Sequence, residues 1–114
     1  MIVVSLGLAT ICFLNQCYPA LVGKTTPTGH YQLRERRVLS PGYGGDVLVF
    51  MEERDDLLAI HRVWLGKPSE QRLDRLASVR VERRRGVTGG CINVAPDVYA
   101  KLLDCCRNAD LTIE

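Results

Sequence analysis

Short apolar runs alternate with polar turn residues through the first third of the chain, and this pattern predicts β-strands. The run Ile2–Leu14 is rich in β-branched residues and predicts one buried strand. Asn15–Gln16 predicts the turn that follows, and Cys17–Val22 the returning strand. Thr25–Gly29 holds a proline and a glycine two apart, which predicts a second turn. His30–Leu33 then resumes as a short strand.

The middle of the chain predicts a loop and a hairpin. Ser40–Asp46 is rich in Gly and Pro and predicts a loop. Val47–Phe50 and Leu57–Ile60 are short apolar runs separated by a charged turn, Glu52–Asp56. Two such runs joined by turn residues predict a β-hairpin.

Helical spacing appears only in the last half. Leu73 and Leu76 stand three apart, so a short surface helix is expected after Pro68. A longer helix is predicted from Pro96, because proline suits the first helical position and Asp97 complements a helix N-terminus. The apolar stripe of this longer helix consists of Val98, Leu102 and Cys105.

Asn108 is expected to end the longer helix in a left-handed conformation, and Leu111–Ile113 predicts a final strand. Taken together, the elements predict a mainly β protein. We expect a compact barrel-like or sandwich-like sheet with one or two short helices. The length of 114 residues predicts a single domain, residues 1–114.

Composition and charge narrow the function classes. Apolar residues make up 46% of the chain and charged residues 25%, as in ordinary globular proteins. The net charge of +2 is too small to predict a nucleic-acid partner. The basic clusters Arg34–Arg37 and Arg83–Arg85 are therefore expected to be solvated surface, with attraction to an anionic polymer as the alternative.

The apolar run at the start of the chain raises the question of membrane insertion or export. It is shorter than the roughly 20 residues that cross a bilayer, so no membrane span is predicted. No Lys or Arg precedes it, and no A-x-A-like cleavage site follows it. We expect it to be a strand of the fold and see no export signal in it.

The chain has five cysteines: Cys12, Cys17, Cys91, Cys105 and Cys106. No C-x-x-C pair occurs and only two histidines are present, so no metal site is predicted. Cys105 and Cys106 are expected to be small core residues. Cys12 and Cys17 are expected to be unbridged, with a bridge across their turn as the alternative in an oxidising compartment. An odd count leaves at least one cysteine free.

Cys91 is the candidate for chemistry, because it follows two glycines in Thr88–Asn93, "TGGCIN". A cysteine nucleophile needs a base and donors for an oxyanion. The N–H groups of Gly90 and Cys91 are candidate donors. His61, at a predicted strand end, is a better candidate base than His30, which follows a turn. A buried cysteine and a core histidine are the structural alternative.

The helix expected after Cys91 and a nearby imidazolium would both depress the pKa of its thiol. We therefore expect Cys91 to react with iodoacetamide at neutral pH faster than an ordinary thiol.

Four segments, in order, resemble the L,D-transpeptidase catalytic domain, or YkuD domain. They are "IVVSL" at 2–6, "VGKTTPTGHYQL" at 22–33, "AIH" at 59–61 and "TGGCIN" at 88–93. The resemblance covers essentially the whole chain. Three residues depart from it: Arg62 stands where glycine is frequent, Gly89 where His or Arg is frequent, and Asn93 where Arg is frequent. The interval between His61 and Cys91 is also longer than usual.

The resemblance implies an acyl transfer on peptidoglycan tetrapeptide stems. Cys91 would attack the carbonyl at the L-centre of an L,D-peptide bond, release D-alanine and form a thioester. An amine from a second stem would then make a cross-link, whereas water would give carboxypeptidase activity. His61 would be the base, oriented by the backbone carbonyl of Arg62.

The resemblance also implies the supporting groups. The N–H groups of Gly90 and Cys91 would stabilise the oxyanion, and Thr88, Gly89 and Asn93 would shape the loop or contact substrate. No cofactor is implied. The charged segment 67–85 would be a lid over the site or a surface insertion. The family implies a periplasmic or cell-envelope location.

Two further functions stay open from the sequence. One is a cysteine hydrolase on muropeptides, such as an L,D-carboxypeptidase. The other is a module that holds stem peptides without turnover, which Arg62 and Gly89 keep open because they flank the candidate chemistry.

Overall fold

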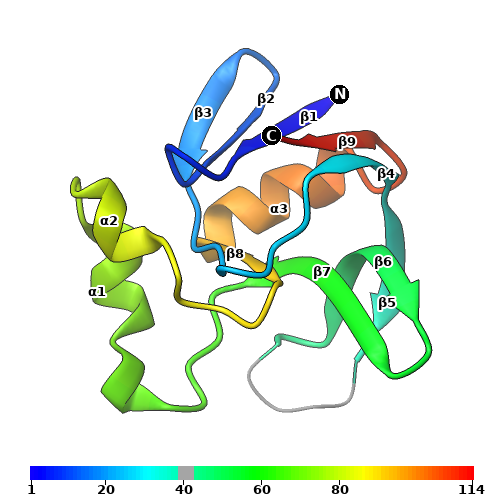
Figure 1. Cartoon of the computed structure of the whole chain (residues 1–114). Coiled ribbons are helices and arrows are strands. Elements are labelled where there is room, and N and C mark those ends of the chain that lie inside the picture. Colours follow the sequence, from blue (N-terminus) through cyan, green and yellow to red (C-terminus); the bar gives the residue numbers. More distant parts are fainter. Residues whose placement is uncertain (39–42) are drawn as a thin grey trace.

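The structure, a computed structural model, describes residues 1–38 and 43–114. Within them the chain is mainly β, with strands in two sheets and a few short helices, as expected (Figure 1). The start of the predicted loop Ser40–Asp46 lies outside the described residues. In the described part no helix combines the length and the apolar character that crossing a bilayer requires.

The first sheet has the order β3-β2-β1-β9-β4. Its strands are β1 (Ile2–Ser5), β2 (Thr10–Phe13), β3 (Gln16–Pro19), β4 (Gly29–Gln32) and β9 (Asp110–Ile113). The single strand predicted over Ile2–Leu14 is wrong. The chain reverses between β1 and β2, where Ala9 has a φ of 50°.

The turn after β2 also differs from the prediction. Phe13 pairs with Gln16, so the two turn residues are Leu14 and Asn15, both with positive φ. Cys12 pairs with Cys17 in the same ladder, and a disulfide joins them. The expectation that these two cysteines are unbridged is wrong, because directly opposed strand residues lie close enough to bond.

The second sheet has the order β5-β6-β7-β8. Its strands are β5 (Arg34–Arg37), β6 (Asp46–Glu53), β7 (Asp56–Arg62) and β8 (Ile92–Val94). The predicted β6–β7 hairpin is confirmed. Strand β5 was not predicted, because all four of its side chains are exposed and polar; that exposure confirms the solvated surface expected there.

Helix α3 (Pro96–Cys105) lies between the two sheets (Figure 1). Val98, Tyr99 and Leu102 on its inner face join the main core with side chains from both sheets. The helix ends at Cys105, with Cys106 as its C-cap, and not through a left-handed Asn108, so that prediction is wrong. Cys106 is buried in the main core, as predicted, whereas Cys105 is exposed, so the prediction is wrong for Cys105; a disulfide joins the two.

The charged segment 67–85 forms a 3₁₀ turn, η1 (Pro68–Glu70), and two short helices, α1 (Arg72–Ala77) and α2 (Val81–Arg84). The short helix predicted after Pro68 is therefore confirmed. Leu76 of α1 packs against Leu21 and Val63 in a small second core.

Arg84 contradicts the prediction that Arg83–Arg85 is solvated, because its side chain is buried. Its guanidinium donates to the carbonyl oxygens of Leu8, Ala9 and Ser78, at 3.0, 3.2 and 2.6 Å. These bonds tie α2 to the β1–β2 turn and so hold the segment against the first sheet.

Candidate active site

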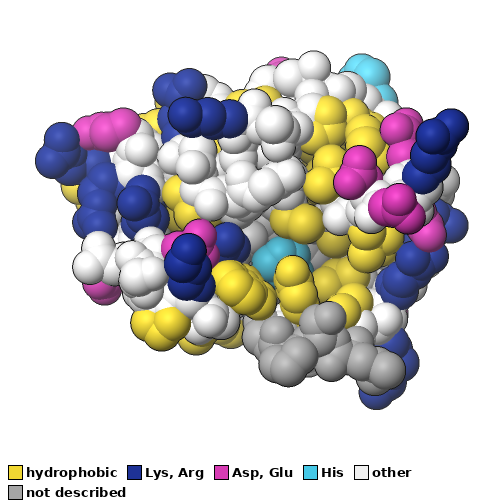
Figure 2. Space-filling view, turned by 60° about the horizontal axis from the view of Figure 1, so that its bottom comes forward, with side chains coloured by type: hydrophobic (Ala, Val, Ile, Leu, Met, Phe, Trp, Pro, Cys, Tyr) yellow, Lys and Arg dark blue, Asp and Glu magenta, His cyan; other side chains and the backbone are white. Residues whose placement is uncertain are grey.

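A cleft of about 410 Å³ opens where β7, the loop before β8 and helix α1 meet. Figure 2 shows this face, with a histidine side chain at the floor of a hollow and a Lys or Arg side chain beside it. The cleft brings together His61 and Cys91, which are distant in sequence. Its other lining residues are Tyr43, Asp55, Asp56, Leu57, Leu58, Trp64, Arg72, Thr88 and Gly89.

His61 is positioned by the parallel pairing of β7 with β8, which sets it opposite Asn93. Its Nδ1 lies 2.6 Å from the carbonyl oxygen of Arg62. A carbonyl only accepts, so Nδ1 carries the hydrogen and Nε2 is left as the acceptor. The Asn93 amide Nδ2 lies 3.5 Å from Nε2.

The imidazole is neutral at rest. The pKa of His61 is lowered to about 4, chiefly by burial; the bond to the Arg62 carbonyl opposes this effect, and the positive charge of Arg72 adds a smaller lowering. A neutral imidazole with an unprotonated Nε2 can accept a proton, which is the state a general base requires.

Cys91 is the one free cysteine in the described part of the chain. Its sulfur lies 3.8 Å from the carbonyl oxygen of Leu57, to which the thiol donates. Burial raises the pKa of this thiol, while a backbone hydrogen bond from Ala59 and the charge of Arg72 lower it by less. The resting residue is a neutral thiol.

The predicted depression of this pKa is therefore wrong. Strand β8 separates Cys91 from the start of α3 at Pro96, so the sulfur does not directly precede a helix N-terminus. The second expected cause was an imidazolium, and His61 is neutral. Alkylation of the free protein at neutral pH is accordingly expected to be slow.

Thr88 organises the loop that carries Cys91. Its hydroxyl donates to the carbonyl oxygen of Cys91 at 2.6 Å and accepts the N–H of Gly90 at 3.2 Å. Thr25 and Thr26 donate to the carbonyl oxygens of Gly89 and Gly90, which fixes the loop from the other side. The N–H of Gly90 is thus occupied at rest.

The two glycines before Cys91 are not equivalent. Gly90 has a φ of +130°, and an added Cβ would lie 2.8 Å from Leu58 Cδ2. Gly89 is exposed, and an added Cβ there would meet nothing within 4 Å. Only Gly90 is required by the backbone; the sequence alone could not separate the two.

Gly90→Ala should lower the free energy of unfolding by roughly 2 kcal/mol, because a side chain at this positive φ is strained and its Cβ would also push the Leu58 side chain aside. Gly89→Ala is the matched control and should change it by less than about 0.5 kcal/mol. Urea unfolding of both variants checks this. Equal losses at the two positions would contradict the loop geometry.

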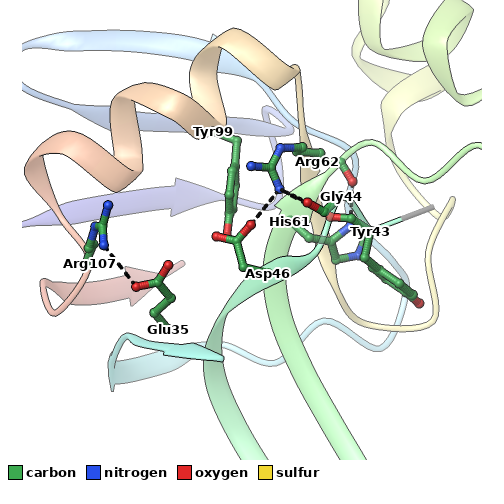
Figure 3. A network of polar contacts seen from close by, with 8 residues as sticks. All are labelled: Glu35, Tyr43, Gly44, Asp46, His61, Arg62, Tyr99 and Arg107. Atoms are coloured by element: carbon green, nitrogen blue, oxygen red, sulfur yellow. Dashed lines mark hydrogen bonds and ion pairs between the residues drawn. The ribbon is translucent and has the colours of Figure 1, made fainter. Parts of the chain in front are cut away.

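A polar network holds the imidazole from behind (Figure 3). The Arg62 guanidinium pairs with Asp46 at 3.0 Å and stacks on the Tyr99 ring, with 4.3 Å to the centroid. It also lies 3.4 Å from the carbonyl oxygens of Tyr43 and Gly44. The Tyr43 ring packs edge-on against His61, with 4.6 Å between centroids.

This network explains the arginine that departs from the resemblance. Arg62 links the loop after residue 42 to α3, and so helps to keep Tyr43 against the imidazole. The sequence did not single out Asp46 or Tyr99. The charged residue directly after His61 was the one signal that could have led to them.

Asn93 connects the other side of the cleft. Its Oδ1 accepts the backbone N–H of Trp64 at 3.0 Å and Nη1 of Arg72 at 3.1 Å. The Arg72 guanidinium lies over the Trp64 ring, 5.0 Å from the centroid. Neither Trp64 nor Arg72 was predicted, because their approach depends on how segment 67–85 folds back.

Within residues 1–38 and 43–114, no three His, Cys, Asp or Glu side chains gather in a way that could hold a metal ion. The cleft itself presents a thiol, an imidazole and hydrogen-bond donors.

Compared with known proteins, the sequence matches no family model and no curated protein. Several solved structures are similar, among them the following three. The L,D-transpeptidase of Xylanimonas cellulosilytica is 13% identical with a TM-score of 0.62, and the match covers 99% of this chain and 59% of that one. The L,D-transpeptidase LdtMt1 in complex with imipenem is 19% identical with a TM-score of 0.61, and the match covers 99% of this chain and 57% of that one. Bd1075 of Bdellovibrio bacteriovorus is 18% identical with a TM-score of 0.63, and the match covers 100% of this chain and 47% of that one.

This chain spans between about half and three-fifths of the length of those proteins. At 13 to 19% identity the similarity establishes the fold: the chain folds like an L,D-transpeptidase catalytic domain.

Proposed function

We propose that the protein is a cysteine-dependent L,D-transpeptidase that acts on peptidoglycan tetrapeptide stems. The observation that carries the proposal is that Cys91 and His61 line one cleft on a fold shared with L,D-transpeptidases. The resting groups, a neutral thiol and a neutral imidazole with Nε2 free of hydrogen, support it, because they are the reactants of a nucleophile–base pair.

In the first step the Cys91 sulfur attacks the carbonyl at the L-centre, and Nε2 of His61 takes the thiol proton. The carbonyl becomes an oxyanion and then re-forms as the C–N bond breaks. His61 returns the proton to the nitrogen of D-alanine, which leaves. A thioester on Cys91 remains.

In the second step an amine of another stem attacks the thioester. His61 takes the proton of the amine and returns it to the sulfur, so the thiol is regenerated with the cross-link. Water in place of the amine would give the tripeptide acid, so the carboxypeptidase alternative uses the same residues.

The oxyanion donors need one revision of the sequence hypothesis. No hydrogen bond of the described chain uses the N–H of Cys91, so this donor is available. The N–H of Gly90 is bound to the Thr88 hydroxyl and joins in only if that bond exchanges for one to the oxyanion. Thr88 thereby controls one of the two donors.

The two disulfides suggest where the reaction takes place. Cys12–Cys17 and Cys105–Cys106 leave Cys91 as the free thiol of the described residues. Disulfides persist in oxidising compartments. A cell-envelope location fits both these bonds and a peptidoglycan substrate.

The test is incubation with a disaccharide-tetrapeptide, followed by mass spectrometry of the products. A cross-linked dimer with release of D-alanine is expected, and Cys91→Ala should abolish it. His61→Gln should slow it by at least about 100-fold, as expected for loss of a general base.

His30→Gln is the matched control, because His30 is exposed and contacts Thr112 on the first sheet, away from the cleft. Tripeptide without dimer would indicate a hydrolase. Retention of unchanged peptide would indicate a binding module, and product formation by Cys91→Ala would refute the proposal.

A further inference from the structure

The charged segment 67–85 contributes Arg72 to the cleft that holds Cys91 and His61. Resting on the proposed function, we infer that Arg72 binds a carboxylate of the donor stem and restricts the protein to donors that carry this group near the scissile bond.

The position of Arg72 fits this role. It is the one Lys or Arg among the described residues that line the cleft. Its Nη1 bonds to Asn93, whose amide nitrogen lies 3.5 Å from Nε2 of His61. The guanidinium is thus separated from the base by one side chain, that of Asn93.

The Arg72 guanidinium has hydrogen-bond donors that no group of the described chain uses. A guanidinium has five N–H groups in a fork that matches a carboxylate. Within the described chain, Nε bonds to Glu70 and Nη1 to Asn93, and no bond uses Nη2. No buried side-chain nitrogen of the described residues lacks a partner, so Nη2, which has none, is not fully buried. Its two N–H groups can meet a ligand.

The guanidinium is also held in place. Its side chain is only 12% exposed, with the Trp64 ring on one face and Glu70 at the Nε edge. Glu70 offsets part of the charge but leaves the Nη2 end uncovered. Arg84 and Leu76 fasten the segment to the rest of the fold. A positioned donor loses less entropy on binding than a mobile surface arginine.

The charges along the cleft favour one orientation of the donor. Asp55 of the β6–β7 turn and Asp56 at the start of β7 line the cleft with no cation of their own among its lining residues. They would repel a carboxylate from that end, and the sulfur of Cys91 lies beside Leu57, next to them. The carboxylate of the donor peptide is therefore expected to lie at the end of the cleft that holds Arg72.

Two carboxylates lie on the residues that flank the scissile bond, and binding can distinguish which of them supplies this contact. The full chain carrying Cys91→Ala is titrated by NMR with three synthetic tetrapeptides. The first has diaminopimelate at its third position and a free C-terminal D-alanine. The second ends in D-alaninamide, and the third has lysine at its third position, which lacks the side-chain carboxylate.

The amide or the lysine peptide should bind about 10- to 100-fold more weakly than the first, as expected for loss of a charged hydrogen bond. The weaker of the two identifies the carboxylate. Arg72→Met should remove the preference, and Arg72→Lys should restore part of it. Arg80→Met, in the same segment but exposed and outside the cleft, should leave it intact.

Equal binding of all three peptides, or a preference that survives Arg72→Met, would overturn the inference. Measuring turnover by the unaltered protein distinguishes failure of the Arg72 inference from failure of the proposed transpeptidase function. Selective binding without turnover refutes the transpeptidase and leaves Arg72 assigned, whereas turnover without selectivity refutes Arg72 alone. Neither binding nor turnover refutes both.

Discussion

Arg84→Met should lower the free energy of unfolding by roughly 3 kcal/mol or more, since it removes the charged donor from one buried and two part-buried hydrogen bonds to carbonyl oxygens. Three backbone oxygens, of Leu8, Ala9 and Ser78, receive bonds from this one guanidinium. Its side chain is 5% exposed, so water cannot easily replace them. Urea unfolding measures the loss as a lower midpoint with an unchanged slope.

Arg85→Met is the matched control, because Arg85 is exposed and should contribute less than about 0.5 kcal/mol. If Arg84→Met does not fold at all, Arg84→Lys keeps the charge and should recover part of the stability. Equal stability of the Arg84→Met and Arg85→Met variants would show that the bonds at position 84 do not hold segment 67–85.

His61 should make the fold sensitive to acid between about pH 6.5 and pH 4. The folded pKa is about 4, whereas an unfolded histidine titrates near 6.5. Below about 6.5 the unfolded chain therefore binds a proton that the folded chain does not, so stability falls as pH falls. The contribution is fully present above pH 6.5, and roughly 3 kcal/mol is lost by pH 4.

Urea unfolding at pH 7 and pH 4 measures this loss, and an NMR titration of the imidazole measures its pKa directly. Carboxylates also titrate in this range, so the comparison is with His61→Gln, which should lack the histidine part of the loss. An imidazole that titrates near 6.5 in the folded protein would contradict the buried, neutral base.

The sequence predicted those parts of the fold whose signals are local. The β6–β7 hairpin and the α3 helix follow from apolar runs, turn residues and a proline at the helix start. The predicted strand over Ile2–Leu14 failed because its apolar character continues through the β1–β2 turn. Strand β5 was missed because a fully exposed strand has no apolar alternation.

For the candidate site, the sequence predicted the two reactive residues but not all of the residues around them. The cysteine and histidine stood out by residue type and by the segments around them, and the structure places both in one cleft. Arg72 and Trp64 could not be predicted, because helix α1 reaches the cleft only through tertiary packing. The direction of the thiol pKa was mispredicted because burial outweighs the nearby positive charge, and burial is not visible in a sequence.

The central claim is that Cys91 carries the acyl group and that His61 activates it. The most direct test is rapid acid quenching of the protein with a tetrapeptide donor, followed by peptide mapping. The account predicts a tripeptide acyl group on the peptide that contains Cys91, absent in Cys91→Ala and formed far more slowly in His61→Gln. An acyl group on another residue, or full turnover with no acyl group on Cys91, would contradict it.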